Sequence, residues 1–210
     1  MEKPRPRVII SIATASLLWF YMFSPWTGYL SNFWLNMSIS AIILSCLAAF
    51  RPGLAVEVPT GRKAAFQILT GIAVAFALWG IFRVGDFLSQ LIFPFARGQV
   101  ESVYSMKEGS NPVLIALLLL FLIGPAEEFF WRGYIQRSLS VQIGDNAALV
   151  VTTLTYALVH VWSFNFMLVM AALVAGSVWG LIYRLKPSLL PAIIISHALW
   201  DALVFVILPI

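Results

Sequence analysis

Apolar segments take up most of this chain, and short polar connections separate them. Seven segments come close to or exceed the roughly 17 to 25 residues that a helix needs to cross a hydrocarbon core about 30 Å thick. They are residues 8–23, 32–50, 64–95, 112–138, 147–163, 166–183 and 188–208. The pattern therefore predicts an all-α protein, a polytopic transmembrane helical bundle of about seven membrane helices.

The composition supports this prediction. Hydrophobic residues make up 61% of the chain and charged residues 10%, and the mean hydropathy is +0.93. These values lie far from those of soluble globular domains. Since the connections are brief except for 97–111, we expect residues 1–210 to form a single integral membrane domain with no second, soluble domain.

The distribution of lysine and arginine predicts an orientation, because these residues prefer the cytoplasmic side of short membrane loops. If the amino terminus is cytoplasmic, the outer segments carry only Arg97 and Lys107. The inner segments then carry Lys3, Arg5, Arg7, Arg51, Arg62, Lys63, Arg132, Arg137, Arg184 and Lys186. We therefore expect a bacterial inner membrane protein with its carboxyl terminus outside. The net charge of +4 is explained by this topology and by anionic lipid headgroups, and no nucleic-acid partner is expected.

Ionisable residues inside the apolar segments indicate where function lies. They include both histidines, His160 and His197, and three of the nine acidic residues, Glu127, Glu128 and Asp201. Ionisable groups in hydrocarbon are costly, so they usually face one another or a water-filled cavity and mark a functional site. The sequence thus predicts an active site inside the membrane.

The fourth segment contains GPAEEFFWRGYIQR. Pro125 has no N–H to donate, and Gly124 beside it weakens the helix, so we expect a kink or local opening before the acidic pair. Glu128 and Arg132 are four residues apart and can pair on one helix face, while Glu127 points about 100° away. In the alternative interpretation these residues form an interfacial cluster, with Arg132 about two turns from the cytoplasmic end of the helix.

The fifth and seventh segments carry similar pairs. Tyr156 and His160 are four residues apart, as are His197 and Asp201. At a helical rise of about 1.5 Å per residue, both histidines, Asp201 and Glu127 lie roughly 14 to 20 Å from the cytoplasmic ends of their segments. We therefore expect one constellation, although each histidine alone could be a neutral core residue. Such a constellation suits hydrolysis, with Glu127 as general base on water, histidine as proton shuttle and His197 near the oxyanion.

These motifs resemble those of the CPBP family of intramembrane proteases, which includes the type II CAAX prenyl proteases and Abi proteins. The family pattern is EExxxR, then FxxxH, then HxxxN or HxxxD. It corresponds here to Glu127 through Arg132, Tyr156 through His160 and His197 through Asp201, within residues 112–208.

The resemblance implies a CAAX protease-like, glutamate-type endopeptidase that needs no cofactor and cleaves a membrane protein or lipidated peptide. Glu127 and His160 would activate water, His197 with Asp201 would support the oxyanion, and Glu128, Arg132 and Tyr156 would be orienting residues. Tyr156 stands where the family has phenylalanine. Asp201 stands where the prenyl proteases have asparagine, and an ionised aspartate can orient His197 but cannot donate to an oxyanion.

Other interpretations remain open at this point. His160, His197 and a carboxylate from Asp201 or Glu127 are acceptable zinc ligands, which would make the protein a zinc-dependent intramembrane metalloprotease. The same polar residues could form the relay of a proton-coupled membrane transporter, or fix helix register in a scaffold without activity. Replacement of Glu127 separates these alternatives. The oligomeric state is not predicted.

Three further features carry structural predictions. Arg83 and Asp86 form a possible interfacial pair near the outer end of the third segment. Small residues on one face of the sixth segment predict close helix packing within the bundle. These are Ala172, Gly176 and Gly180. Four tryptophans near segment ends are expected to anchor the helices at the membrane interface. These are Trp19, Trp26, Trp34 and Trp162.

Overall fold

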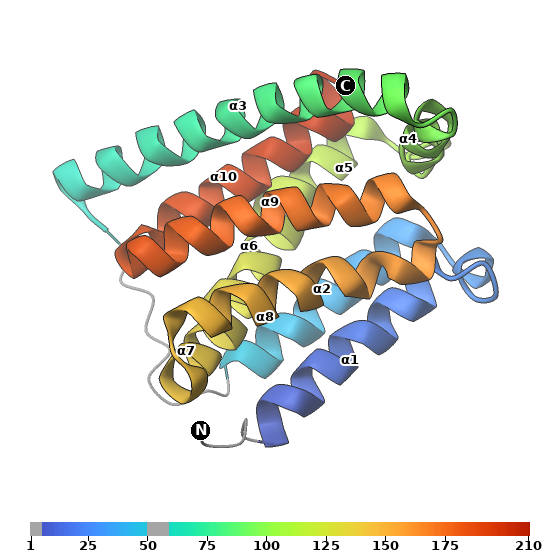
Figure 1. Ribbon diagram of the computed structural model, residues 1–210. Helices are drawn as coiled ribbons and strands as arrows, with labels where there is room; N and C mark the ends of the chain where they lie inside the picture. Colours follow the sequence, from blue (N-terminus) through green and yellow to red (C-terminus); the bar gives the residue numbers. More distant parts are fainter. Residues whose placement is uncertain (1–5, 50–58) are drawn as a thin grey trace.

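The computed structural model describes residues 6–49 and 59–210, and all regular secondary structure in these ranges is helical (Figure 1). The long helices are α1 (Pro6–Phe23), α2 (Phe33–Ala49), α3 (Gly61–Ile92), α8 (Asp145–Leu158), α9 (Phe166–Leu185) and α10 (Leu190–Ala202). One continuous helix is made of α5 (Pro112–Leu118), η2 (Leu119–Ile123), α6 (Gly124–Glu128), η3 (Phe129–Gln136) and α7 (Arg137–Ile143). The shorter elements are η1 (Gly28–Leu30), α4 (Ala96–Ser105), η4 (Val159–Ser163), η5 (Pro187–Leu189) and η6 (Leu203–Ile207).

The seven predicted segments all correspond to helices. Six helices in the described part of the chain are long and apolar enough to cross a membrane, and the seventh, α2, is a shorter apolar helix of 17 residues. The protein is therefore an integral membrane protein with a polytopic helical bundle. The fourth helix runs to Ile143, five residues beyond its predicted end, and the third ends at Ile92, before α4. Lys3, Arg5, Phe50 and Arg51 of the sequence predictions lie outside the described residues.

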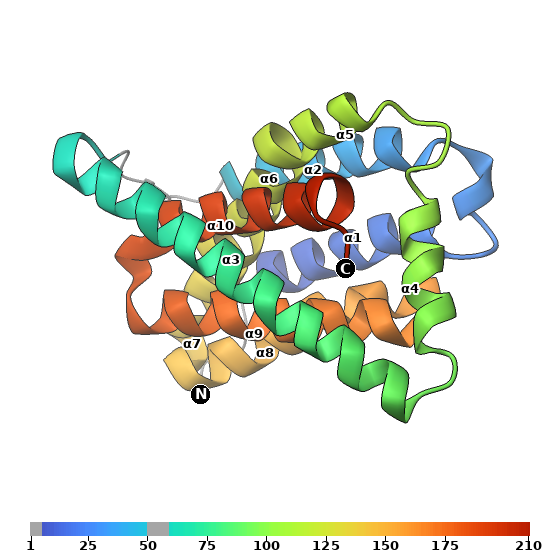
Figure 2. The same cartoon turned by 90° about the horizontal axis from the view of Figure 1, so that it is seen from above.

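Different segments of the chain lie at the two ends of the helix bundle (Figures 1 and 2). We call one the α4 end; it also holds the carboxyl terminus and the last turns of α1, α3, α8 and α10. The other, which holds α7 and the first turn of α1, we call the basic end. Its described basic residues are Arg7, Arg62, Lys63, Arg137, Arg184 and Lys186.

Helix α10 is a central element of the bundle, because α3 packs on one side of it and α6 on the other (Figure 2). Each of these two contacts requires a glycine, because a side chain there would collide with α10. A Cβ at Gly71 would lie 2.8 Å from the Ala192 carbonyl oxygen, and a Cβ at Gly124 would lie 2.7 Å from Cα of Ala198. The glycines thus let two helix backbones approach α10 closely, which places Glu127 and Glu128 beside it.

The small-residue face of the sixth span packs inside the bundle, as predicted. A Cβ at Gly176 would lie 2.8 Å from Cδ1 of Tyr156, and one at Gly180 would lie 2.8 Å from Cδ1 of Leu149. Ala172 is buried as well. The close contact of α8 and α9 therefore places the Tyr156 ring against the sixth span.

The opening expected next to Pro125 takes the form of wider, π-helical turns, and the helix continues through it. The π-helical turn Leu119–Ile123 directly precedes Gly124 and Pro125, and a second π-helical stretch, Phe129–Gln136, follows the acidic pair. Proline lacks the N–H that an α-helix would use here, and π-helical turns adjust the bonding pattern without breaking the helix. Such turns frequently occur at functional sites.

Helix α4 is fastened to the bundle by side-chain hydrogen bonds. The Asn165 amide donates to the Gln99 carbonyl (2.8 Å), and Lys107, just after α4, donates to the Phe205 carbonyl (2.8 Å). The Tyr104 hydroxyl accepts from the backbone N–H of Ile210 (2.9 Å), and burial raises the pKa of this phenol. The loop between the third and fourth spans is thus an ordered cover on the α4 end.

The predicted interfacial pair of Arg83 and Asp86 is wrong. Arg83 is exposed and its guanidinium lies 5.8 Å from the Trp79 ring centroid, whereas Asp86 is half-buried and accepts from the Gln90 amide (2.7 Å). The two side chains point about 60° apart around the helix. This difference is enough for Asp86 to line the edge of the cavity while Arg83 stays exposed.

Candidate active site

A charged cluster lies buried where the fourth and seventh spans meet. Oε1 of Glu128 accepts from Arg132 Nη1 (2.7 Å) and from His197 Nδ1 (2.6 Å). On the other side of the imidazole, His197 Nε2 lies 3.4 Å from Asp201 Oδ2. The pairs Glu128–Arg132 and His197–Asp201, predicted from their i, i+4 spacing, are thus both formed. Glu128 connects the two pairs, because it also accepts from His197.

Arg132 lies inside the bundle, so the interfacial alternative is wrong for this residue. Its side chain is 0% exposed, and Nη2 donates to the Gly176 carbonyl (3.0 Å). The guanidinium also lies 4.9 Å from the ring centroid of Tyr156 and 5.6 Å from that of Trp179. Because the helix continues to Ile143, Arg132 is about three turns from its end, farther than expected.

Trp179 supports the imidazole of His197. The two rings are stacked with centroids 4.0 Å apart and planes 16° from parallel. The Trp179 indole N–H donates to the Ser196 hydroxyl (3.1 Å), which fixes the indole in turn. His197 is therefore held by two carboxylates at its nitrogens and by an aromatic plane at its face.

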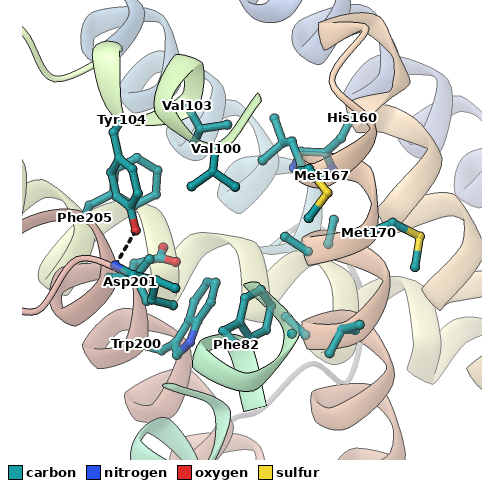
Figure 3. A pocket seen from close by; sticks show the side chains of 18 of the residues that line it. Phe82, Val100, Val103, Tyr104, His160, Met167, Met170, Trp200, Asp201 and Phe205 are labelled. Carbon is teal, nitrogen blue, oxygen red and sulfur yellow. Dashed lines mark hydrogen bonds between the residues drawn. The ribbon is translucent and has the colours of Figure 1, made fainter. Parts of the chain in front are cut away.

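A cavity of about 450 Å³ extends from this cluster toward the α4 end (Figure 3). Its walls are mostly apolar and include Phe82, Val103 and Met170. Asp201 and His160 line it as well, from the seventh and fifth spans. The cavity therefore combines mostly apolar walls with polar residues from the fourth, fifth and seventh spans.

On the fourth to seventh spans the cavity lining stops well short of the basic end. The residues nearest the basic end are Glu127 on the fourth span, Tyr156 on the fifth, Ala175 on the sixth and His197 on the seventh. We call these four residues the floor of the cavity. Glu127, both histidines and Asp201, which the sequence predicts at similar depths, all line this cavity.

Glu127 has a free acceptor on the floor. Its side chain is buried, with 4% of the residue exposed, and Oε2 has no hydrogen-bond partner in the described structure. Its electrostatic neighbours include His197, Asp201 and the Tyr156 side chain. Tyr156, the tyrosine that replaces the family's phenylalanine, thus interacts through its side chain with the carboxylate. Glu127 is therefore the carboxylate on the cavity floor that can accept a proton.

His160 is held at both ring nitrogens. Nδ1 faces the Tyr156 carbonyl at 2.8 Å and must donate, since a carbonyl only accepts. Nε2 accepts from the indole N–H of Trp19 (3.1 Å), and an indole only donates. These partners define a neutral imidazole with its proton on Nδ1.

Trp19 is a site residue that the sequence interpretation missed. We expected an interfacial anchor, but its side chain is 0% exposed and reaches His160 from α1. Trp34 is also buried and donates to the Met106 carbonyl (3.0 Å), so it too differs from a membrane-facing anchor. In the sequence, a tryptophan one turn before a helix end is compatible with an interfacial anchor and with a buried site residue. Only the packing of α1 against η4 distinguishes these two roles for Trp19.

The two histidines considered as zinc ligands have protein partners at all of their ring nitrogens. His160 uses both nitrogens for Trp19 and Tyr156, and the nitrogens of His197 face Glu128 and Asp201. A zinc-bound histidine must offer one nitrogen lone pair to the metal. Within the described residues, no group of three potential ligands is placed to hold a metal ion.

Comparison with known proteins adds one match. Residues 109–203 match the model of the family described as type II CAAX prenyl endopeptidase Rce1-like. This segment contains Glu127, Glu128, Arg132, His197 and Asp201. None of the curated proteins and none of the solved structures with which the chain was compared matches it.

Proposed function

Because this chain belongs, over residues 109–203, to the Rce1-like family of type II CAAX prenyl endopeptidases, we propose that it hydrolyses a peptide bond inside the membrane with water activated by Glu127. The match identifies a membrane protease at family level. The observation that carries the glutamate mechanism is the position of Glu127 on the cavity floor, with one carboxylate oxygen unpartnered. A buried acceptor beside a cavity suits a general base.

The proposed reaction begins with a water between Glu127 and the scissile carbonyl. Glu127 takes one proton from the water, and the water oxygen attacks the carbonyl carbon. The carbonyl oxygen becomes an oxyanion. The C–N bond then breaks, and the proton held by Glu127 passes to the leaving nitrogen. Charge on the oxyanion must be stabilised by a preorganised donor.

His197 is the proposed donor to the oxyanion. Its Nδ1 is engaged by Glu128 at 2.6 Å, whereas the 3.4 Å separation between Nε2 and Asp201 is too long for a strong hydrogen bond. The Nε2–H group can therefore donate to the oxyanion of the substrate, while Asp201 orients the ring. Glu128 and Arg132 hold this arrangement from the side away from the cavity.

His160 is the second residue that the family resemblance assigns to water activation. Its Nε2 lone pair is occupied by the Trp19 indole, so direct proton transfer requires that this hydrogen bond be exchanged for water. In the proposed mechanism Glu127 is therefore the base, and neutral His160 shapes the water site. Tyr156 orients the Glu127 carboxylate.

The proposed substrate is a membrane protein or lipidated peptide presented from the bilayer. Few polar residues line the cavity away from its floor. Three methionines line it, Met37, Met167 and Met170, and their side chains are adaptable and apolar. We also propose a bacterial inner membrane location with the amino terminus in the cytoplasm. The gathering of lysine and arginine at the basic end supports this orientation.

Proteolysis by reconstituted protein tests the proposal. The full chain and its Glu127→Gln variant are placed in liposomes with a membrane-anchored peptide library, and cleavage products are identified by mass spectrometry. We expect products from the wild type and none from the variant. Glu101→Gln is the matched control, because Glu101 is exposed on α4 and pairs only with Arg97 in the described structure. Cleavage by Glu127→Gln at the wild-type rate refutes Glu127 as the base.

A further inference from the structure

The two ends of the bundle differ in charge. In the sequence, the segments at the α4 end carry three basic residues, Arg83, Arg97 and Lys107, and three acidic ones, Asp86, Glu101 and Glu108. The described segments at the basic end carry six basic residues and one acidic one, Asp145; the six are Arg7, Arg62, Lys63, Arg137, Arg184 and Lys186. The remaining described basic residue, Arg132, is buried. In the orientation proposed above, in which the end rich in lysine and arginine is cytoplasmic, the α4 end lies on the extracytoplasmic side of the membrane.

The cavity lies entirely toward the α4 end. Beyond the floor, no described residue closer to the basic end lines it on the fourth, fifth, sixth or seventh span. On α3 the lining begins only at Ile81 and continues to Ser89. Helix α4 adds Val103 and Tyr104 at the far end (Figure 3).

A hydrogen-bonded layer closes the other side of the floor. Arg132 donates to the Gly176 carbonyl and Gln136 to the Gly180 carbonyl (2.9 Å), so both side chains fasten the fourth span to the sixth. Trp179 lies beside them, and none of the three side chains is more than 1% exposed. A peptide arriving from the basic end would have to break this layer and separate buried charges, which is costly.

From these observations we infer that the protease receives its substrate from the extracytoplasmic side. Its substrate class is then a membrane-anchored protein or lipopeptide with an apolar, uncharged segment in the outer half of the bilayer or just beyond it. This inference rests on the proposed function for the cleavage itself. The position of the cavity, however, can be tested without any cleavage.

Cysteine labelling tests which side the cavity faces. Cys46 is exposed and is first replaced by serine. Cysteines are then introduced singly at Val103 or Met167, which are half-exposed and line the cavity, and at Ser188, which is exposed at the basic end. None of these changes alters the charge of the loops. Thiols accessible to water react with a membrane-impermeant maleimide.

We expect V103C and M167C to be labelled in intact cells with their outer membrane opened, and S188C only in inside-out vesicles. Labelling of V103C and M167C only in inside-out vesicles overturns the inference, and so does a failure of both to react from either side. Two cavity positions are used so that a folding defect in one variant does not decide the result.

The position of the cleaved bonds tests the substrate class. New protein termini are compared between membranes of cells that produce the wild type and those that produce Glu127→Gln. We expect Glu127-dependent termini in extracytoplasmic juxtamembrane segments. Termini confined to cytoplasmic tails, as for a prenylated carboxyl terminus, overturn the inference while leaving the proposed protease intact. Absence of Glu127-dependent termini refutes the proposed function and this substrate class together, and the labelling result still decides the side of the cavity.

Discussion

The indole N–H of Trp19 donates to Nε2 of His160 across 3.1 Å, although the two residues are 141 positions apart. The indole and imidazole rings meet edge to face at 79°, and both residues are buried. Trp19 lies outside residues 109–203, which match the family. The first span thus supplies a hydrogen bond that fixes the tautomer of His160, a residue of the second motif on the fifth span.

Replacement of Trp19 tests this contact. Trp19→Phe keeps an aromatic ring but leaves the buried Nε2 of His160 without a donor, which costs about 1–3 kcal/mol of stability. We expect this loss in the free energy of unfolding in mixed micelles, together with a lower kcat and an unchanged KM. Trp26→Phe is the control, since Trp26 is 61% exposed. Equal effects of the two substitutions would show that the hydrogen bond to His160 is unimportant.

The pair of Glu128 and Arg132 is expected to dominate the stability of the site. Both side chains are 0% exposed, and Glu128→Gln leaves the Arg132 guanidinium without its counter-charge. Breaking a buried pair in this way costs about 3–5 kcal/mol. The exposed pair of Arg97 and Glu101 offers a matched comparison, because Glu101→Gln should cost less than about 1 kcal/mol. Unfolding curves of the two variants measured side by side give the difference, and similar values would contradict the buried pair's role.

The close approach of α8 and α9 predicts a steric effect at Gly176. A side chain there meets the Tyr156 ring at 2.8 Å, so Gly176→Val should destabilise the protein by about 1–3 kcal/mol through overpacking. Activity should fall as well, because Tyr156 and Arg132 both contact this region. Gly80→Ala has open space and should change stability by no more than about 1 kcal/mol. A fully stable and active Gly176→Val variant would show that α9 can move away without consequence.

Asp201 separates two possible roles for the last motif residue. Asp201→Asn retains an acceptor for His197 and adds an amide donor, so we expect cleavage to remain close to the wild-type rate. Asp201→Ala removes the partner of His197, and cleavage should fall by about tenfold or more. Initial rates on the peptide library in liposomes measure both variants. If Asp201→Asn is as impaired as Asp201→Ala, the negative charge itself is required.

Chelators should leave cleavage unchanged. The nitrogens of His160 and His197 already face protein partners, so neither imidazole offers a lone pair for a zinc ion. Activity is measured before and after dialysis against a zinc chelator, with metal content determined on the same sample. Loss of activity that is restored by added zinc would require a rearranged site.

Local spacing accounts for much of what could be predicted. The apolar segments have the length of a membrane helix, and all seven correspond to helices in the structure. The pairs of Glu128 with Arg132 and His197 with Asp201 follow from i, i+4 spacing, which brings side chains together on any helix. The order of these motifs also indicated the family that matches residues 109–203.

The remaining features depend on which faces of the helices meet. Sequence spacing cannot show that Glu128 reaches His197 or that Trp19 reaches His160, because these contacts join helices far apart in the chain. It also left the burial of Arg132 open and misplaced Asp86, because the burial of both residues depends on neighbouring helices. Hydrophobic patterning therefore determined the number and nature of the spans, whereas tertiary packing decided the partners of each charge and the end of the bundle toward which the cavity extends. The physical reason is that helix formation is local, while burial and ion pairing are set by long-range contacts.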